Sequence, residues 1–506
     1  MRHYPLPFVI SKSTVDVMRD DELRRNLTVA NPWWGAASAH QDPAAAIQDR
    51  RLLRDRAQYD LGYRPPILAD IARLPVGGAL VLLTGPRRVG KSVALLDLAS
   101  ALCQREDVSA FQVIYVPCDG MQARDLRRSL TLARELTRPA DVVSSRPRVW
   151  LLDEVSNVSG WTSIIKVARD GTDLGDDTLI VTGSRWRDGE DVEGNLMAGR
   201  AGSTGVRRSR HLLPMTFRDF LVATRTSLAL PESVHPSELQ SSQARAALEG
   251  FQFQVDDYDL AWQDFLTCGG FPRAVAEHRR DGAVSDDFLR DIAASLRGDI
   301  QLDGAPQSLP LLLSQLETRS SSPLNIANLA LSLSWTRATT DGRINRLVSS
   351  FGAMWCRQHG DSGQVVQGSQ AKLYLVDPVL SWLPSRLRAG LPTPDVTRLT
   401  EAMLGVSLAR AIDSLDEGRW VAADTIGYVK TDSGNEIDLC PVDVQSPGGP
   451  RRSTPIEGKW VDDGWRAEAK VLTNKYGLGV LATKSILNLD YEVWAVPAPL
   501  VALLLA

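Results

Sequence analysis

The stretch from Ala79 to Ser92 constrains this chain more than any other. An apolar run, Ala79–Thr84, leads directly into GPRRVGKS, and a helix-like segment, Val93–Cys103, follows. This is the pattern G-x-x-x-x-G-K-[ST] between a strand and a helix, the context in which it forms a phosphate-binding loop. The alternative is a glycine-rich turn that binds nothing, and the Lys-Ser pair with both flanking elements argues against it. The sequence therefore predicts binding of a nucleoside triphosphate.

Each residue type in the loop has a physical role. Gly85 and Gly90 permit a tight turn whose backbone N–H groups point inward at a helix N-terminus and cradle phosphate oxygens. Lys91 supplies a positive charge to the β- and γ-phosphates, and Ser92 supplies a hydroxyl ligand for Mg²⁺. The residues predicted to contact the nucleotide are Gly85, Pro86, Arg87, Arg88, Val89, Gly90, Lys91, Ser92, Val93 and, further along, Ser184.

Length and composition set the broad class. A chain of 506 residues is too long for one core and suggests three or four domains. The net charge of -4 gives no overall attraction to nucleic acid. Five scattered cysteines without a C-x-x-C pair fit a reducing cytoplasm. Neither a signal peptide nor an apolar run of transmembrane length is evident, so we expect a cytoplasmic protein without membrane contact.

From 76 to about 225 strands and helices alternate, which predicts an α/β fold with a parallel sheet covered on both faces. The predicted elements after the loop are the strand Gln112–Val116, the helix Met121–Leu136, the strand Val149–Leu152, the helix Trp161–Asp170 and the strand Thr178–Thr182. One whole strand lies between the strand that enters the loop and the strand that ends in Asp153-Glu154.

Polar residues at these strand ends are the candidate hydrolytic groups. Asp153 can present a carboxylate to Mg²⁺, and Glu154 can present the next one to an attacking water. Ser184 is either a polar sensor of the γ-phosphate or a turn residue. Arg200 follows Gly199 and precedes a short predicted strand, Arg210–Leu213, so it can complete the γ-phosphate site.

The motifs GPRRVGKS, VWLLDE, IVTGS, AGR and LLPMTFRDF, in this order, resemble those of bacterial and archaeal AAA-type P-loop ATPases with a C-terminal DUF4143 domain. The segments NPWW, CGGFPRAV and LYLVDPVL extend the resemblance over nearly the whole chain. It implies an AAA-type parallel sheet, a helical lid, a winged-helix-like domain and a nuclease-like α/β domain. The expected units are a lead-in with an NPWW anchor (1–75), the ATPase core (76–225), the lid (226–290), the winged-helix-like domain (291–390) and the C-terminal domain (391–506).

The winged-helix-like domain is predicted from two helices and a hairpin. The helices are Ile326–Leu333 and Arg337–Phe351, and the hairpin strands are Gln364–Val366 and Lys372–Val376. Arginines on the second helix, Arg337, Arg343 and Arg346, could contact DNA phosphates or a major groove. The alternative is a domain-packing module with solvated arginines.

The C-terminal domain contains a candidate metal site. Glu457 and Lys459 form E-x-K on a predicted strand and point to one face, because strand side chains alternate. Asp438 on the strand Glu436–Val442 can face the same point, and Glu401 lies on a helix. Asp438 and Glu457 could hold Mg²⁺ or Mn²⁺ while Lys459 orients water. The set resembles a PD-(D/E)xK nuclease, although Gly458 replaces the usual β-branched residue between Glu and Lys.

Together these patterns predict a cytoplasmic ATPase coupled to a metal-dependent DNA nuclease-like domain. Its predicted catalytic residues are Lys91, Glu154, Arg200, Glu401, Asp438, Glu457 and Lys459, and its predicted metal ligands are Ser92, Asp153, Asp438 and Glu457. The expected partners are ATP, DNA and further copies of the chain. Two alternatives remain open. In one, an ATP-controlled switch carries an inactive nuclease fold that serves in interaction; in the other, the chain is a remodelling motor, which would require a closed ring.

Overall fold

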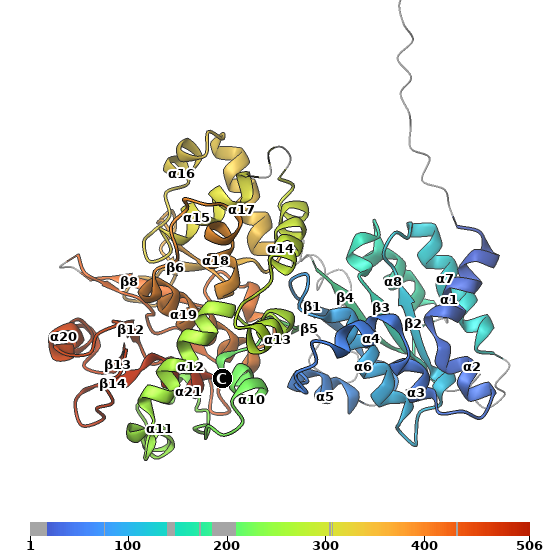
Figure 1. The fold of residues 1–506 in the computed structure, drawn as a ribbon, viewed down its shortest axis with the longest axis horizontal. Coiled ribbons are helices and arrows are strands. Elements are labelled where there is room, and N and C mark those ends of the chain that lie inside the picture. Colours follow the sequence, from blue (N-terminus) through green and yellow to red (C-terminus); the bar gives the residue numbers. More distant parts are fainter. Residues whose placement is uncertain are drawn as a thin grey trace, which may run out of the picture.

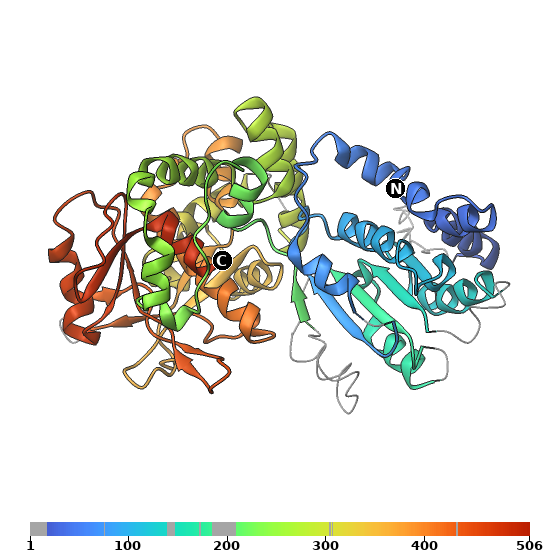
Figure 2. The same cartoon turned by 90° about the horizontal axis from the view of Figure 1, so that it is seen from below.

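The computed structural model describes residues 18–74, 76–138, 147–171, 174–184, 209–302, 305, 307–431 and 434–506. These residues form two lobes, which lie side by side in Figures 1 and 2. We call the part up to His211 the N-terminal lobe, and the part from Leu212 onward the C-terminal lobe. Among the described helices, none combines the length and apolarity that a membrane crossing needs.

The N-terminal lobe is built on a parallel sheet of five strands in the order β2-β3-β4-β1-β5. The strands are β1 (Leu80–Thr84), β2 (Val113–Pro117), β3 (Val149–Asp153), β4 (Thr178–Gly183) and β5 (Ser209–His211). Helices α6 (Lys91–Cys103), α7 (Ala123–Leu136) and α8 (Trp161–Asp170) connect the strands. The predicted parallel α/β sheet is confirmed. The strand that separates β1 from β3 in space is β4, so the ends of these three strands lie together.

Five short helices precede the sheet: α1 (Asp20–Ala30), α2 (Pro32–Ser38), α3 (Pro43–Gln48), α4 (Arg51–Ala57) and α5 (Pro66–Ala72). The NPWW segment docks on the edge strand β2. Asn31 accepts from the backbone N–H of Tyr115 at 2.7 Å and donates to its carbonyl at 2.8 Å, as a neighbouring strand would. The indoles of Trp33 and Trp34 both donate to the Val113 carbonyl. These contacts cover the outer edge of β2, and both tryptophans are buried there.

The C-terminal lobe contains most of the helices. They are α10 (Phe217–Thr224), α11 (Ser242–Leu248), α12 (Val255–Cys268), α13 (Pro272–Asp281), α14 (Asp286–Asp299), α15 (Ser308–Glu317), α16 (Ile326–Ser332), α17 (Arg337–Ser349), α18 (Pro378–Leu387), α19 (Val396–Leu415), α20 (Trp465–Tyr476) and α21 (Ala498–Leu505). Short 3₁₀ turns add η1 (Ala110–Gln112) and η2 (Val155–Asn157) in the first lobe and η3 (Pro236–Glu238), η4 (Phe251–Phe253) and η5 (Arg419–Val421) in the second. The wholly buried α21 lies inside this lobe, near the C-terminus marked in Figure 1.

The strands of the C-terminal lobe form three small sheets, ordered β7-β6-β8-β9, β10-β11 and β12-β13-β14. They are β6 (Ala353–Gln358), β7 (Lys372–Leu375), β8 (Gly427–Lys430), β9 (Glu436–Ile437), β10 (Asp443–Val444), β11 (Arg451–Arg452), β12 (Ile456–Gly458), β13 (Gly479–Thr483) and β14 (Val493–Pro497). The strand predicted at Gln364–Val366 is wrong: β7 pairs with β6, and only Val365 forms a bridge, to His359. Because β6 also pairs with β8, one sheet takes strands from both sides of residue 390.

Three of the sequence motifs meet where the lobes join. The turn of CGGFPRAV lies between Met215 and Asp377: Met215 donates its N–H to Gly270, and Gly270 donates its own to the Asp377 carboxylate at 2.7 Å. A Cβ on Gly269 would lie 2.1 Å from Asp377, and one on Gly270 would lie 2.2 Å from the Met215 carbonyl oxygen. The two glycines are therefore required for close packing.

Candidate nucleotide site and the C-terminal acidic cluster

The phosphate-binding loop lies between β1 and α6, as predicted. Gly90 has φ of 99° and Arg88 has φ of 69°, which gives the loop two left-handed residues just before the helix begins at Lys91. Gly85 has an ordinary φ, and its requirement is space, since a Cβ there would lie 1.9 Å from the Leu212 carbonyl oxygen. The loop is thus held against the segment that enters the C-terminal lobe.

The side chain of Lys91 is buried and turned inward. Its ammonium donates to the carbonyls of Gly85 and Pro86, each at 3.0 Å, and lies 3.2 Å from Glu154 Oε1. Burial lowers the pKa of Lys91, and the nearby Glu154 carboxylate opposes that change. The lysine is therefore held at the mouth of the loop by groups that a phosphate could replace.

Asp153, at the end of β3, is fixed by two hydroxyls. Tyr115 donates to its Oδ2 at 2.7 Å, and Thr182 donates to its Oδ1 at 2.8 Å. Tyr115 lies on β2 and Thr182 on β4, the two neighbours of β3, so the sheet itself orients the carboxylate. Burial raises the pKa of Tyr115, and the adjacent Asp153 carboxylate adds to the effect, which keeps the hydroxyl protonated and able to donate.

Glu154 follows in a left-handed conformation, with φ of 52°. This is a sparsely populated region for a non-glycine residue. Its backbone N–H donates to Thr182 Oγ1 at 2.9 Å, so the threonine links the two acidic residues. Its Oε2 is buried and has no hydrogen-bond partner. The turn therefore aims one carboxylate oxygen at Lys91 and leaves the other free for a ligand.

Other polar groups around the loop also lack partners. Ser184 Oγ, just past β4, and Thr84 Oγ1, at the end of β1, are buried without a hydrogen bond. Ser92 and Val93, in the first turn of α6, are half-buried. Buried polar atoms normally find a partner, and these surround the phosphate-binding loop. The residues present therefore fit a triphosphate with Mg²⁺, Ser92 and Asp153 being the candidate ligands of the ion.

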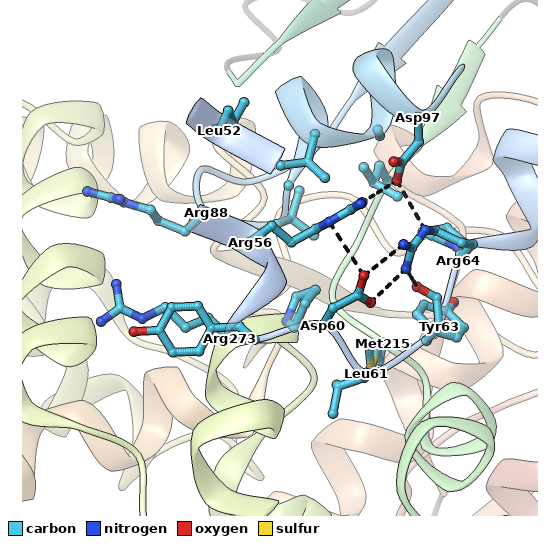
Figure 3. A pocket seen from close by; sticks show the side chains of 18 of the residues that line it. Leu52, Arg56, Asp60, Leu61, Tyr63, Arg64, Arg88, Asp97, Met215 and Arg273 are labelled. Atoms are coloured by element: carbon cyan, nitrogen blue, oxygen red, sulfur yellow. Dashed lines mark hydrogen bonds and ion pairs between the residues drawn. The ribbon is translucent and has the colours of Figure 1, made fainter. Parts of the chain in front are cut away.

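A cavity of about 470 Å³ opens beside the loop (Figure 3). Its walls come from α4 and the segment between α4 and α5, from Val89, Gly90, Val93 and Ala94, and from Met215, Pro272 and Arg273. A cluster of four charged side chains lies along one wall. Arg56 and Arg64 each form ion pairs with both Asp60 and Asp97. Hydrogen bonding to Arg64 holds the pKa of Asp60 at about 2. The Arg273 guanidinium lies 4.9 Å from the centre of the Tyr59 ring.

Two arginines of the loop reach the C-terminal lobe. Arg87 contacts Asp299 at 3.0 Å, and Arg88 contacts Asp291 at 3.4 Å, both acids being on α14. The side chain of Asp299 is only 3% exposed, whereas those of Arg88 and Asp291 are 46% and 40% exposed. Figure 1 shows α14 on the side of the C-terminal lobe that faces β1 and β5. The sequence predicted these arginines as nucleotide contacts only. Arg200, predicted at the γ-phosphate, lies outside the described residues.

The second predicted site is the acidic cluster, by which we mean Glu401, Asp438 and Glu457 together with Lys459. These side chains are brought together. Asp438 lies in a bend just after β9, not within a strand as predicted, and its N–H donates to Glu457 Oε2 at 3.0 Å. Gly458 N–H donates to Asp438 Oδ2 at 3.1 Å. Lys459 lies 3.1 Å from Glu457 Oε1.

A residue that the sequence analysis missed occupies the middle of this cluster. Lys372, on β7, places its ammonium 2.9 Å from Asp438 Oδ1 and 3.0 Å from Glu401 Oε1, and Tyr374 also donates to Glu401 Oε1, at 2.8 Å. Burial and the neighbouring Asp438 raise the pKa of Glu457 to about 8. Nowhere in the described part of the chain are three His, Cys, Asp or Glu side chains arranged to hold a metal ion. As arranged, the cluster does not fit a divalent cation.

Comparison with known proteins agrees with the first site. Residues 78–221 match the model of the AAA domain family. A Walker-type ATPase of Pyrococcus abyssi is 14% identical, with a TM-score of 0.37, over 60% of this chain and 90% of the other. The Aeropyrum pernix ORC2 protein in its ADP form is 12% identical, with a TM-score of 0.30, over 59% and 90%. Scores this low carry no functional argument. No curated protein matches the sequence.

Proposed function

We propose that this chain, whose residues 78–221 form an AAA-type ATPase domain, hydrolyses ATP at the ends of β1, β3 and β4. The observation that carries the proposal is the convergence of Lys91, Asp153 and Glu154. Lys91 and Glu154 are within 3.2 Å of each other, and both oxygens of Asp153 are oriented by hydroxyl donors. A loop that only bound nucleotide would not need a second carboxylate directly after the first.

In this proposal the loop amides and Lys91 hold the β- and γ-phosphates. Ser92 and Asp153 would hold Mg²⁺, which when bound neutralises phosphate charge. Glu154 accepts a proton from the water that attacks the γ-phosphorus, and the bond from that phosphorus to the ADP oxygen breaks. Ser184 donates its unpartnered hydroxyl to the γ-phosphate or to the water, and Arg200 remains the candidate second cation.

Arrival of the γ-phosphate gives Lys91 a new anionic partner. Glu154 Oε1, now at 3.2 Å from that ammonium, is then released to contact water. The same carboxylate therefore has two positions, one against lysine and one against the substrate water.

The function of a nucleotide-controlled switch, the alternative from the sequence, is supported by the arginines of the loop. Arg87 and Arg88 belong to the segment that wraps the phosphates and also pair with Asp299 and Asp291 on α14. Bound phosphates would compete with Asp299 and Asp291 for the same guanidinium groups. We therefore propose that the nucleotide state changes the strength of this contact and so the position of the C-terminal lobe.

DNA binding and DNA cleavage both remain predictions. Of the predicted arginines on α17, Arg337 and Arg346 are exposed and available for phosphate, while Arg343 lies 4.2 Å from the centre of the Trp335 ring. Metal-dependent cleavage is disfavoured by the buried ammonium of Lys372 within the acidic cluster. Between the two predicted outputs, we favour interaction over nuclease activity.

The direct test of ATP hydrolysis is phosphate release by the full chain with ATP and Mg²⁺. We expect turnover that Lys91→Ala reduces at least about 100-fold, because the lysine is a charge contact to the transferred phosphoryl group. Lys470→Ala removes an exposed lysine on α20 and serves as the matched control. Equal turnover by the parent chain and Lys91→Ala would refute the assignment.

A further inference from the structure

Lys372 is a lysine that solvent does not reach. Its side chain is 1% exposed, and it lies on β7 opposite Cys356, in the interior of the C-terminal lobe. A buried ammonium is tolerated only when carboxylates or other acceptors pair with it. Lys372 has two acids within 3.0 Å and a third, Glu436, at 3.6 Å, and it lies 5.4 Å from the centre of the Tyr428 ring. Its position is therefore fixed by the acidic cluster.

Most carboxylate oxygens of the cluster already face a donor of the protein. Asp438 receives Lys372 on one oxygen and the Gly458 N–H on the other. Glu457 faces Lys459 with one oxygen and receives the Asp438 N–H on the other. Glu401 Oε1 receives both Lys372 and the Tyr374 hydroxyl. A hard divalent cation needs such oxygens as ligands, and the Lys372 ammonium already lies between those of Asp438 and Glu401.

The ammonium groups of Lys372 and Lys459 already supply positive charge to the three carboxylates of the cluster. Displacing Lys372 would leave a buried ammonium without its counter-ions, which is strongly unfavourable.

We propose that Lys372 is the resident cation of the acidic cluster, so that the cluster binds no divalent metal ion and cleaves no phosphodiester. The ammonium joins β7 to α19, to β9 and to the bend after β9, and it does so in place of a metal. The C-terminal lobe then serves in interaction and not as a nuclease. This inference concerns a separate site and stands whether or not the chain hydrolyses ATP.

The first experiment is Mn²⁺ binding to the full chain without nucleotide, followed by electron paramagnetic resonance. The parent chain and Asp438→Asn should bind the same number of Mn²⁺ ions, because any binding elsewhere is common to both. Neither should cleave linear or branched DNA in Mn²⁺. Loss of one Mn²⁺ ion in Asp438→Asn, or cleavage that this variant abolishes, would overturn the proposal.

The second experiment replaces the lysine. Lys372→Met should lower the midpoint of thermal unfolding by roughly 10 °C, because it leaves the buried carboxylates without their counter-ion. Added Mn²⁺ should restore part of that loss in the variant, since the place of the ammonium is then empty. The matched control is Lys430→Met, because Lys430 is 45% exposed and pairs with Glu436 at the rim of the same sheet; its midpoint should stay near that of the parent. Equal midpoints for the two variants would contradict the role of Lys372. Should Lys372→Met fail to fold, the comparison of Mn²⁺ binding and DNA cleavage between the parent chain and Asp438→Asn still tests the proposal.

Discussion

The ammonium of Lys91 lies 3.2 Å from the Oε1 atom of Glu154. The pair joins the first turn of α6 to the end of β3, across the place where the triphosphate would enter. Each residue neutralises the other while no phosphate is present, which limits the cost of burying both. In the proposed mechanism nucleotide binding has to open this pair, which connects binding to the release of the proposed general base.

Tyr115→Phe should slow hydrolysis without changing nucleotide affinity. The hydroxyl of Tyr115 fixes Asp153 Oδ2 at 2.7 Å, and the ring remains in place in the variant. Losing one hydrogen bond to a charged group costs on the order of 1–2 kcal/mol, or about a tenfold loss of kcat. Steady-state kinetics and an ATP binding isotherm would check this. A fall in affinity with unchanged kcat would show that Tyr115 does not orient the metal-binding carboxylate.

The contact between Arg87 and Asp299 should transmit nucleotide binding to α14. We expect Arg87→Ala and Asp299→Asn each to abolish the nucleotide-dependent change in hydrogen exchange of α14, and the double variant to add nothing. Arg290→Ala is the control, since Arg290 lies on the same helix but forms only exposed pairs with Asp286 and Asp287. Additive effects of the two substitutions would argue against a shared contact.

Stability should fall as pH rises toward neutrality because of Asp377. Burial raises the pKa of Asp377 to about 7 from its ordinary 3.8. The folded chain thus keeps a proton that the unfolded chain releases, so this contribution is complete below about pH 4 and is lost as pH rises through about 7. Denaturant midpoints between pH 5 and 8 should decline in the parent chain. Asp377→Asn should show a flatter profile, and parallel profiles would exclude Asp377 as the cause.

Much of the N-terminal lobe was predictable because its signals are local. Long apolar runs bounded by glycine or acidic residues identified β1, β3 and β4, and α8 has the predicted bounds, Trp161–Asp170. The phosphate-binding loop was equally evident. By contrast, nothing near Tyr115 or Thr182 in the sequence indicates that their hydroxyls meet at Asp153, since that depends on the order of strands in the sheet.

The acidic cluster shows the same limit more sharply. Glu401, Asp438, Glu457 and Lys459 were predicted to meet and do lie together. Lys372 lies in the alternating strand sequence AKLYL, where a single lysine is typical of a solvent-facing position. Only the pairing of β7 with β6, and of β6 with β8, brings it against those acids. One buried cation from a distant strand therefore changed the interpretation of the whole site.

Single-turnover hydrolysis by Glu154→Gln, measured together with ATP affinity, tests the central claim most directly. The amide keeps the size of the side chain but cannot accept the proton of the attacking water. We predict that Glu154→Gln binds ATP with an affinity within a few-fold of the parent chain, while its rate of hydrolysis falls about 100-fold or more. A hydrolysis rate equal to that of the parent chain, at equal ATP occupancy, would contradict the assignment of Glu154 as the base.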